Sequence, residues 1–290
     1  RKNSSELFHT VATVSSYCEL DAGKKGINMS RISRSINEFV PKFGKYEEVI
    51  QAVKLLKRNH KSKSAWIKIK FEYIIDSNSP LSNERSFEPV DVEMECYIDD
   101  NNKIRNYITV ESTEMSLCPC SKNMSLLMSN LTKDENDWFN ENIKNIPDSL
   151  LVKMSNVGFG AHNQKSKIKI SVEASQSKTI WIEDILEIIQ KSSSCPTFTT
   201  LKRADEKYVT EVSYSGGYID EDGEWNMIEG AGPKFVEDIG RSIADKLNGL
   251  IKSKDISDWT IVVDNQESIH SGDISACSIL YYDRDLKNNY

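Results

Sequence analysis

Long hydrophobic runs, cysteine pairs and histidines are all scarce in this 290-residue sequence. No stretch of about 18 apolar residues occurs, so no membrane-spanning helix is expected. The first residues, RKNSSELF, lack the apolar core of a secretory signal. The six cysteines are scattered apart from one CPC pair, which does not indicate a disulfide framework. A reducing, cytoplasmic location is therefore expected.

The sequence also lacks a positive charge excess and the common nucleotide-binding glycine motifs. Its net charge of −7 argues against nucleic acid or an anionic membrane as the main partner, while a local basic pocket for a small anion is compatible with it. Neither G-x-G-x-x-G nor G-x-x-x-x-G-K-[ST] occurs. With 38% hydrophobic and 28% charged residues, the composition is that of an ordinary globular protein.

Hydrophobic periodicity predicts more strands than helices. Alternating or β-branched runs predict strands at 8–20, 66–75, 90–99, 103–113, 167–175, 259–269 and 275–283. Helical spacing predicts helices at 45–60, 181–194 and 233–251. In the last helix, Pro233 is expected in the first turn and Phe235 on the apolar stripe. Because strands and helices are grouped rather than alternating, the pattern favours an α+β fold with an antiparallel sheet.

The cysteines divide into two kinds. Cys18, Cys96 and Cys277 lie in apolar, strand-like segments, and we expect them to be small buried hydrophobic residues. Cys118 and Cys120 belong to SLCPCSK, and no second cysteine pair exists to complete a four-thiolate zinc site. The CPC pair is therefore either one metal ligand or nucleophile with a neighbour, or two inert thiols.

Four further residues are candidates for a site, although each has a simple structural explanation. His162 and His270 stand beside glycine turns, where exposed histidines are common. Glu206 lies among alternating charges in LKRADEKYVTE, as expected of a solvated surface. Glu237 lies off the apolar stripe of its predicted helix, where a carboxylate near the N-terminus is favourable for the helix dipole.

Several motifs taken in order carry a stronger signal than any one of them. This ordered set closely resembles the type IB GTP cyclohydrolase I family, from about residue 8 to about residue 280; its motifs are HTVATVSSYCELDAGKKGINMSR, SLCPCSK, GAHNQKSK, WIEDILEI, LKRADEKYVTE, PKFVEDI and NQESIH. The resemblance implies a tunnelling fold (T-fold) with two units in one chain, at about 8–115 and 160–285. It also implies a homo-oligomer, expected to be a tetramer, with active sites at subunit interfaces.

The family reaction converts GTP and water into 7,8-dihydroneopterin triphosphate and formate, the first step of folate, pterin or deazapurine synthesis. The resemblance assigns Cys118, His162 and Glu206 to one divalent metal, which could be zinc, ferrous iron or manganese. It assigns proton transfer to His270 and the guanine edge to Glu237. On this assignment Cys120 is a neighbour of the metal ligand and not a second ligand. For the triphosphate, charge and proximity to the motifs indicate Arg31, Lys122, Lys165, Lys202 and Arg203.

The sequence departs from the family pattern in ways that leave the product open. Insertions are predicted near 126–156 and 215–232, the second of them loop-like. Asn28 stands where the family usually has histidine, and the segment after His270 lacks a second histidine. Two alternatives therefore remain. One is the archaeal ferrous-iron enzyme, which makes a cyclic phosphate of dihydroneopterin, and the other is a T-fold protein that binds a purine or pterin without turnover.

Overall fold

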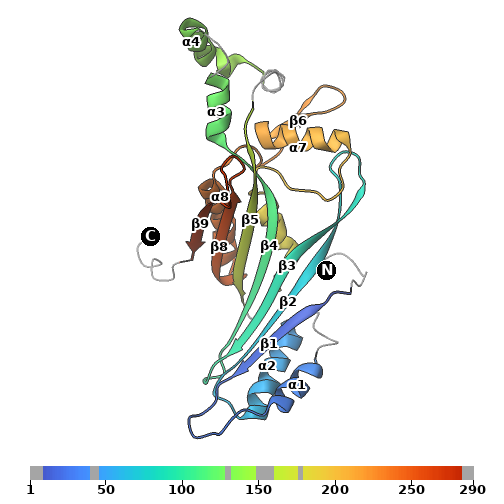
Figure 1. The fold of residues 1–290 in the computed structure, drawn as a ribbon, viewed down its shortest axis with the longest axis vertical. Helices are drawn as coiled ribbons and strands as arrows, with labels where there is room; N and C mark the ends of the chain where they lie inside the picture. The colour runs from blue at the N-terminus through green and yellow to red at the C-terminus, as the bar shows by residue number, and fades with distance from the viewer. Residues whose placement is uncertain (1–8, 40–45, 128–131, 148–159, 176–178, 283–290) are drawn as a thin grey trace.

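The computed structural model describes residues 9–39, 46–127, 132–147, 160–175 and 179–282. One seven-stranded sheet runs through the molecule, and every neighbouring pair of strands in it is antiparallel (Figure 1). Its strands, in spatial order, are β1 (Ala12–Cys18), β2 (Ala65–Asn78), β3 (Arg85–Ile98), β4 (Ile104–Leu117), β5 (Asn163–Ala174), β8 (Ile256–Gln266) and β9 (Ser275–Tyr281). β1 and β9 are the two edges.

Two pairs of helices accompany the sheet, each inserted between neighbouring strands. The first pair, α1 (Met29–Asn37) and α2 (Tyr46–His60), connects β1 to β2. In the second half, α6 (Ile182–Gln190) and α8 (Val236–Lys252) lie between β5 and β8 in the chain. Three further helices lie near one end of the sheet in Figure 1: α3 (Pro119–Leu127), α4 (Lys133–Asn142) and α7 (Arg203–Ser215). This arrangement confirms the predicted α+β class with an antiparallel sheet and paired helices.

One face of the sheet is apolar and carries the core. Directly opposed residues on this face, such as Ile67 with Cys96 and Val110 with Ile170, are fully buried. They form one continuous cluster with apolar residues of α2, α6 and α8. The boundaries of the two units stay a prediction, since neither the sheet nor this core is interrupted between them. Among the described residues, no helix has the length and hydrophobicity that crossing a bilayer requires.

The strand register brings several distant motifs to one end of the sheet. Leu117 at the end of β4 pairs with Asn163 at the start of β5, so Cys118 and His162 are the next residues on the two strands. Lys165 of β5 pairs with Gln266 of β8, so the turn that follows β8 extends beyond the same end. We call this end of the sheet, where β4 ends and β5 begins, the Cys118 corner.

Two local predictions were wrong, one for the segment 215–232 and one for the start of the last helix. The predicted loop at 215–232 contains a small hairpin of β6 (Gly217–Ile219) and β7 (Trp225–Met227). The charged run in LKRADEKYVTE, for which no element was predicted, forms α7, and Glu206 is exposed there as expected. Pro233 precedes α8, because Phe235 is the N-cap residue, and Phe235 is 41% exposed. The predicted insertion at 126–156 includes α4 and a short 3₁₀ turn, Ile143–Asn145, but residues 128–131 and 148–156 lie outside the described chain.

The prediction of buried structural cysteines was only partly right. Cys96 is fully buried, and Cys18 is half-buried. Cys277 is exposed, because it lies on the edge strand β9 and faces away from the helices. An apolar alternation on an edge strand therefore does not establish that both of its faces are covered.

Candidate active site

The Cys118 corner is held together by backbone contacts. The Cys118 N–H donates to the His162 carbonyl across 3.4 Å, which continues the β4–β5 ladder past its last pair. Pro119 is the first residue of α3, a position that needs no N–H donor. The Ser121 N–H donates to Cys118 Sγ at 3.4 Å, and the His162 N–H donates to Ser121 Oγ at 3.4 Å. The turn therefore holds both candidate metal ligands.

The chemistry of this pair suits a metal ion. Cys118 stands at the N-terminus of α3, where its sulfur accepts a backbone N–H and lies near the positive end of the helix dipole. The sequence predicted an exposed His162, but this residue is half-buried. Its Nδ1 atom is buried and has no hydrogen-bond partner among the described residues. A buried ring nitrogen without a partner costs free energy unless something binds it. A divalent metal held by Cys118 Sγ and His162 Nδ1 would satisfy that atom.

The start of α8 is bound to the same corner. The Lys234 N–H donates to the Leu117 carbonyl at 3.1 Å, and Ser116 Oγ donates to the Lys234 carbonyl at 3.2 Å. Glu237 lies in the first turn of α8, three residues after Lys234, and its side chain is exposed. His270 is exposed in the turn between β8 and β9. Cys118 and His162 are thus neighbours at this corner, while Glu237 and His270 lie on segments that begin or extend at the same end of the sheet.

Other predicted residues form a second group at the start of α7. Lys202, Arg203 and Glu206 are exposed there, and Lys202 forms an ion pair with Glu84. Between them, the buried Asp205 carboxylate accepts hydrogen bonds from the β2–β3 turn and from the Lys202 N–H. Burial acts to raise the Asp205 pKa, but these hydrogen bonds outweigh it and lower that pKa.

The two groups lie at opposite ends of α7. Lys122, on α3, donates to the Tyr214 carbonyl at 2.6 Å and lies 4.7 Å from the centre of the Tyr214 ring. Burial lowers the Lys122 pKa. This lysine is therefore occupied with the C-terminal end of α7. Glu206 lies about 12 Å along the helix axis from Tyr214, at 1.5 Å per residue.

The described part of a single chain does not assemble the predicted metal set. No group of three or more His, Cys, Asp or Glu side chains suitable for a metal occurs among the residues that the structure describes. Cys118 and His162 are neighbours, while Glu206 belongs to the other group. Arg31 is on α1, at the end of the sheet opposite α3 (Figure 1). Lys165 is exposed on β5, three residues from His162, and so belongs to the Cys118 corner.

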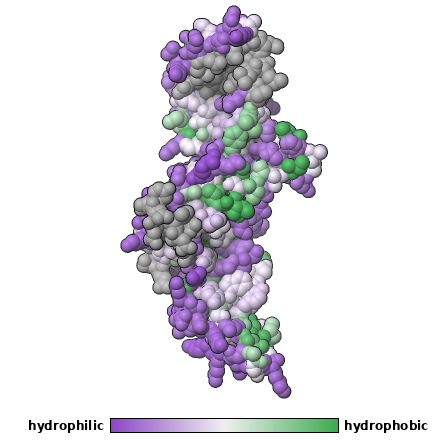
Figure 2. All heavy atoms as spheres, turned by 90° about the vertical axis from the view of Figure 1, so that its left-hand side faces the viewer, coloured by the Kyte–Doolittle hydropathy of each residue, from purple (hydrophilic) through white to green (hydrophobic). Residues whose placement is uncertain are grey.

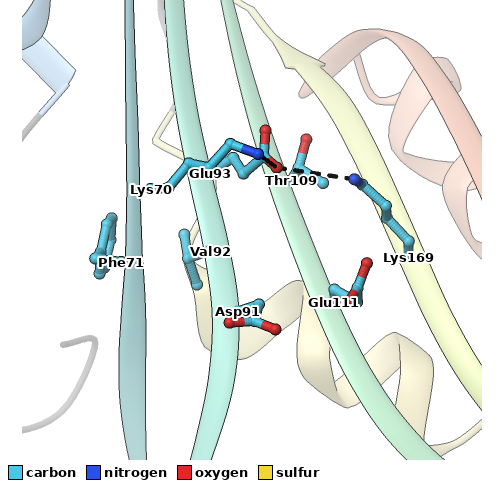
Figure 3. Close-up of a pocket in the computed structure, with 8 residues that line it drawn as sticks. All are labelled: Lys70, Phe71, Asp91, Val92, Glu93, Thr109, Glu111 and Lys169. Carbon is cyan, nitrogen blue, oxygen red and sulfur yellow. Dashed lines mark ion pairs between the residues drawn. The ribbon is translucent and has the colours of Figure 1, made fainter. Parts of the chain in front are cut away.

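A separate hollow of about 360 Å³ lies on the polar face of the sheet (Figure 3). There Glu93 forms ion pairs with Lys70 at 2.7 Å and with Lys169 at 3.8 Å. Lys68 contacts the same carboxylate at 2.5 Å. These charges largely compensate one another. Since Glu111, which also lines the hollow, is about 23 Å along the chain direction of β4 from Cys118, the hollow is not part of the candidate site.

Sequence reasoning missed three residues that build the corner. Ser121 bridges the two candidate ligands, and Ser194 Oγ accepts the Leu117 N–H at 3.1 Å. Lys234 Nζ donates to the carbonyls of Ser192 and Ser193 at 2.7 and 2.9 Å. The run of three serines at 192–194, all buried, is the only sequence signal for this junction, because polar residues in a row are unusual in a core.

These features define an α+β protein with a pair of candidate metal ligands at one end of an antiparallel sheet. A model of the family described as Type I GTP cyclohydrolase folE2 matches residues 1–276, and the chain belongs to this family. GTP cyclohydrolase FolE2 of Thermosipho africanus is 31% identical over 277 residues, covering 96% of this chain and 85% of the relative. The protein of the same name from Thermotoga maritima is 30% identical, covering 92% and 82%.

Solved structures are more distant. A hyperthermostable mutant of Bacillus sp. TB-90 urate oxidase aligns with 94% of this chain and 86% of its own, at 6% sequence identity and a TM-score of 0.47. Another urate oxidase structure from the same organism aligns over the same shares with a TM-score of 0.44.

Proposed function

We propose that this protein is a metal-dependent GTP cyclohydrolase that converts GTP and water into 7,8-dihydroneopterin triphosphate and formate. The observation that supports it best is the Cys118 corner. There a helix-terminal sulfur and a buried imidazole nitrogen, which has no hydrogen-bond partner among the described residues, lie just beyond the ends of two adjacent strands. The family to which the chain belongs supports the reaction itself. The relatives at about 30% identity are named GTP cyclohydrolase FolE2.

Each residue of the corner has a role that its chemistry allows. Cys118 and His162 hold the metal, and zinc, ferrous iron or manganese can accept such ligands. When bound, the metal supplies the Lewis acidity for hydrolysis at C8 of guanine. The Glu237 carboxylate accepts hydrogen bonds from the N1–H and N2–H groups of the base. His270 exchanges a proton with the reacting purine, and Lys165 contacts the triphosphate.

We propose that a second copy of the chain completes the site. Glu206, Lys202 and Arg203 form an exposed group at the far end of α7, where they could not share a metal with Cys118 of the same chain without a large movement. Presented by a neighbouring copy, Glu206 would supply the third ligand, and the two cations would meet the triphosphate.

The sheet edges provide a way for copies to associate. β1 and β9 each have seven residues, and in the described part of the chain no further strand pairs with the outer edge of either. Tyr17 on β1 and both Ile279 and Tyr281 on β9 are more than half exposed. The view from the β9 side shows hydrophobic patches within a mostly hydrophilic surface (Figure 2). Pairing of β9 with β1 of another copy would satisfy both edges and bury these side chains, as in a homo-oligomer such as a tetramer.

The first experiment tests the reaction. Metal-stripped protein is incubated without oxygen with GTP and zinc, ferrous iron or manganese, and formate and the pterin product are measured. Cys118→Ala should abolish formate release, while the matched change Cys120→Ala should leave most of it, because Cys120 is exposed and outside the ligand pair. A cyclic phosphate product would assign the archaeal-type reaction. GTP binding without formate under any metal would contradict the proposal.

The second experiment tests the shared site. Cys118→Ala and Glu206→Gln chains, each inactive alone, are denatured together and refolded as a mixture. If the two ligands come from different copies, mixed oligomers regain activity, because one site in each pair receives both native residues. If they come from one chain, the mixture stays inactive.

Light scattering measures the oligomer size and tests the β9 edge. It compares Ile279→Lys with Trp138→Lys, a control at a similarly exposed position.

A further inference from the structure

Lys234 joins the start of α8 to the end of β4. Its backbone N–H and carbonyl bond to Leu117 and Ser116, the two residues before Cys118. Both of these bonds are made by backbone atoms of position 234, so they do not depend on the lysine side chain. The lysine side chain must therefore have another purpose.

The Lys234 ammonium group collects backbone carbonyls from two loops. It donates to the oxygens of Ser192 and Ser193 at 2.7 and 2.9 Å, and also to the Gly230 oxygen. Burial and the nearby Lys246 lower the Lys234 pKa to about 8. Gly230 has a φ of +77°, and a Cβ atom there would lie 2.4 Å from the Lys191 oxygen. The loop around the ammonium group is therefore packed backbone against backbone.

The same loops are fixed to the Cys118 corner by further bonds. Ser194 accepts the Leu117 N–H through its hydroxyl and the Gly232 N–H through its carbonyl. Lys234 thus closes a ring of contacts that runs from β4 through the serine run to the first turn of α8. That turn carries Glu237, whose exposed carboxylate makes none of these contacts itself.

We propose that Lys234 is a positioning residue that fixes the start of α8 against the Cys118 corner and so aligns the Glu237 carboxylate with the purine base. This inference rests on the proposed function, which makes guanine the ligand of Glu237. Guanine presents two donors on one edge, N1–H and N2–H, whereas hypoxanthine presents only N1–H. A carboxylate held at one angle can accept both guanine donors, and a loosened one loses the second bond first.

The ratio of the dissociation constants for inosine triphosphate and GTP therefore measures how well the Glu237 carboxylate is aligned. Calorimetry on metal-stripped protein gives both dissociation constants without turnover. Lys234→Met should weaken GTP binding by about 10- to 100-fold, as expected for losing one hydrogen bond to a charged group, and inosine triphosphate binding much less. Lys246→Met is the matched control, because Lys246 contacts the hydroxyls of Ser192 and Ser242 but none of the loop carbonyls. Lys246→Met should preserve the preference for GTP. Lys234→Arg should retain part of the preference that Lys234→Met loses.

Two measurements separate alignment from simple loss of stability. In a double-mutant cycle with Glu237→Gln, the Lys234→Met change should have little further effect on GTP affinity, since both act on the same bond. Additive losses, or an equal loss for both nucleotides, would overturn the proposal. Hydrogen exchange of the unliganded protein should rise at residues 115–121 and 231–238 in Lys234→Met but not in Lys246→Met. Unchanged exchange in Lys234→Met would refute the alignment role. A wild-type protein that bound no GTP would instead refute the proposed function, and the exchange measurement would still test the alignment role.

Discussion

The change Asp205→Asn tests how α7 is held in place. Asp205 is fully buried and accepts four hydrogen bonds. One carboxylate oxygen accepts the N–H groups of Leu81 and Ser82, both at 2.9 Å. The other accepts the Ser82 hydroxyl at 2.5 Å and the Lys202 N–H at 2.8 Å. Asparagine has nearly the same shape but keeps only one acceptor oxygen, so at least one N–H donor would face an NH₂ group.

The expected loss follows from these contacts. A hydrogen bond to a charged group contributes about 1.5–3 kcal/mol. Loss of negative charge at the first turn of α7 adds about 0.3–1 kcal/mol. We therefore expect Asp205→Asn to lower the free energy of unfolding by about 2–4 kcal/mol. Because the pKa of Asp205 lies below its ordinary value of 3.8, the carboxylate stabilises the fold above that pH, and its contribution is lost only as the pH falls through the lowered pKa. The difference should be constant from neutral pH down to about pH 5.

Asp238→Asn is the matched control, since Asp238 holds the same position in the first turn of α8. Its carboxylate accepts the Phe235 N–H at 3.0 Å and pairs with Arg241, but its side chain is 40% exposed. We expect a loss of about 1 kcal/mol or less there. Urea unfolding at fixed protein and metal concentration measures both variants. Equal losses in the two variants, or a loss under about 1 kcal/mol for Asp205→Asn, would refute the reasoning.

Three other outcomes are expected. Burial raises the pKa of Glu114 to about 7. Wild-type stability should therefore fall by up to about 3 kcal/mol as the pH rises from about 4.5 to 8, and Glu114→Gln should remove this slope in pH-dependent unfolding. Gly230→Ala should cost at least about 1 kcal/mol more than Gly223→Ala in thermal unfolding. Both glycines have positive φ, but only at Gly230 would the added Cβ meet a backbone oxygen. A chelator should lower the melting temperature of the wild-type protein and not that of Cys118→Ala.

Some elements could be predicted because a single face of each decides its pattern. The alternation in β3 and β8 matches their burial, since one side of each strand packs on helices while the other stays polar. α7 could not be found this way. Its apolar contacts belong to a small separate cluster that includes Cys195, Val209 and Val212. Its start is set by Asp205 bonding to Leu81, which is 124 residues away in the sequence, and no local pattern records such a contact.

Part of the candidate site could likewise be predicted from the sequence, and part could not. The order of the motifs could predict that Cys118 and His162 lie together, and the antiparallel register explains why: each lies one residue beyond the last β4–β5 pair. The position of Glu206 could not be predicted, because it depends on how far α7 extends from that corner. A motif match therefore predicted which side chains belong to the reaction, but not which of them one chain brings together.

The Cys118 corner and the group at the start of α7 are held in place by different contacts, and this difference is expected to affect activity. The Cys118 corner is built from backbone ladders and the first turn of α8, all continuous with the main core. α7 lies outside that core and is held by its small cluster, by the Asp205 network and by the contact of Lys122 with Tyr214. A helix attached in this way can shift without unfolding the sheet. If a second copy supplies Glu206, the docking of α7 then sets the distance between the metal ligands across the interface. Asp205→Asn should for that reason reduce formate release under conditions where the sheet remains fully folded.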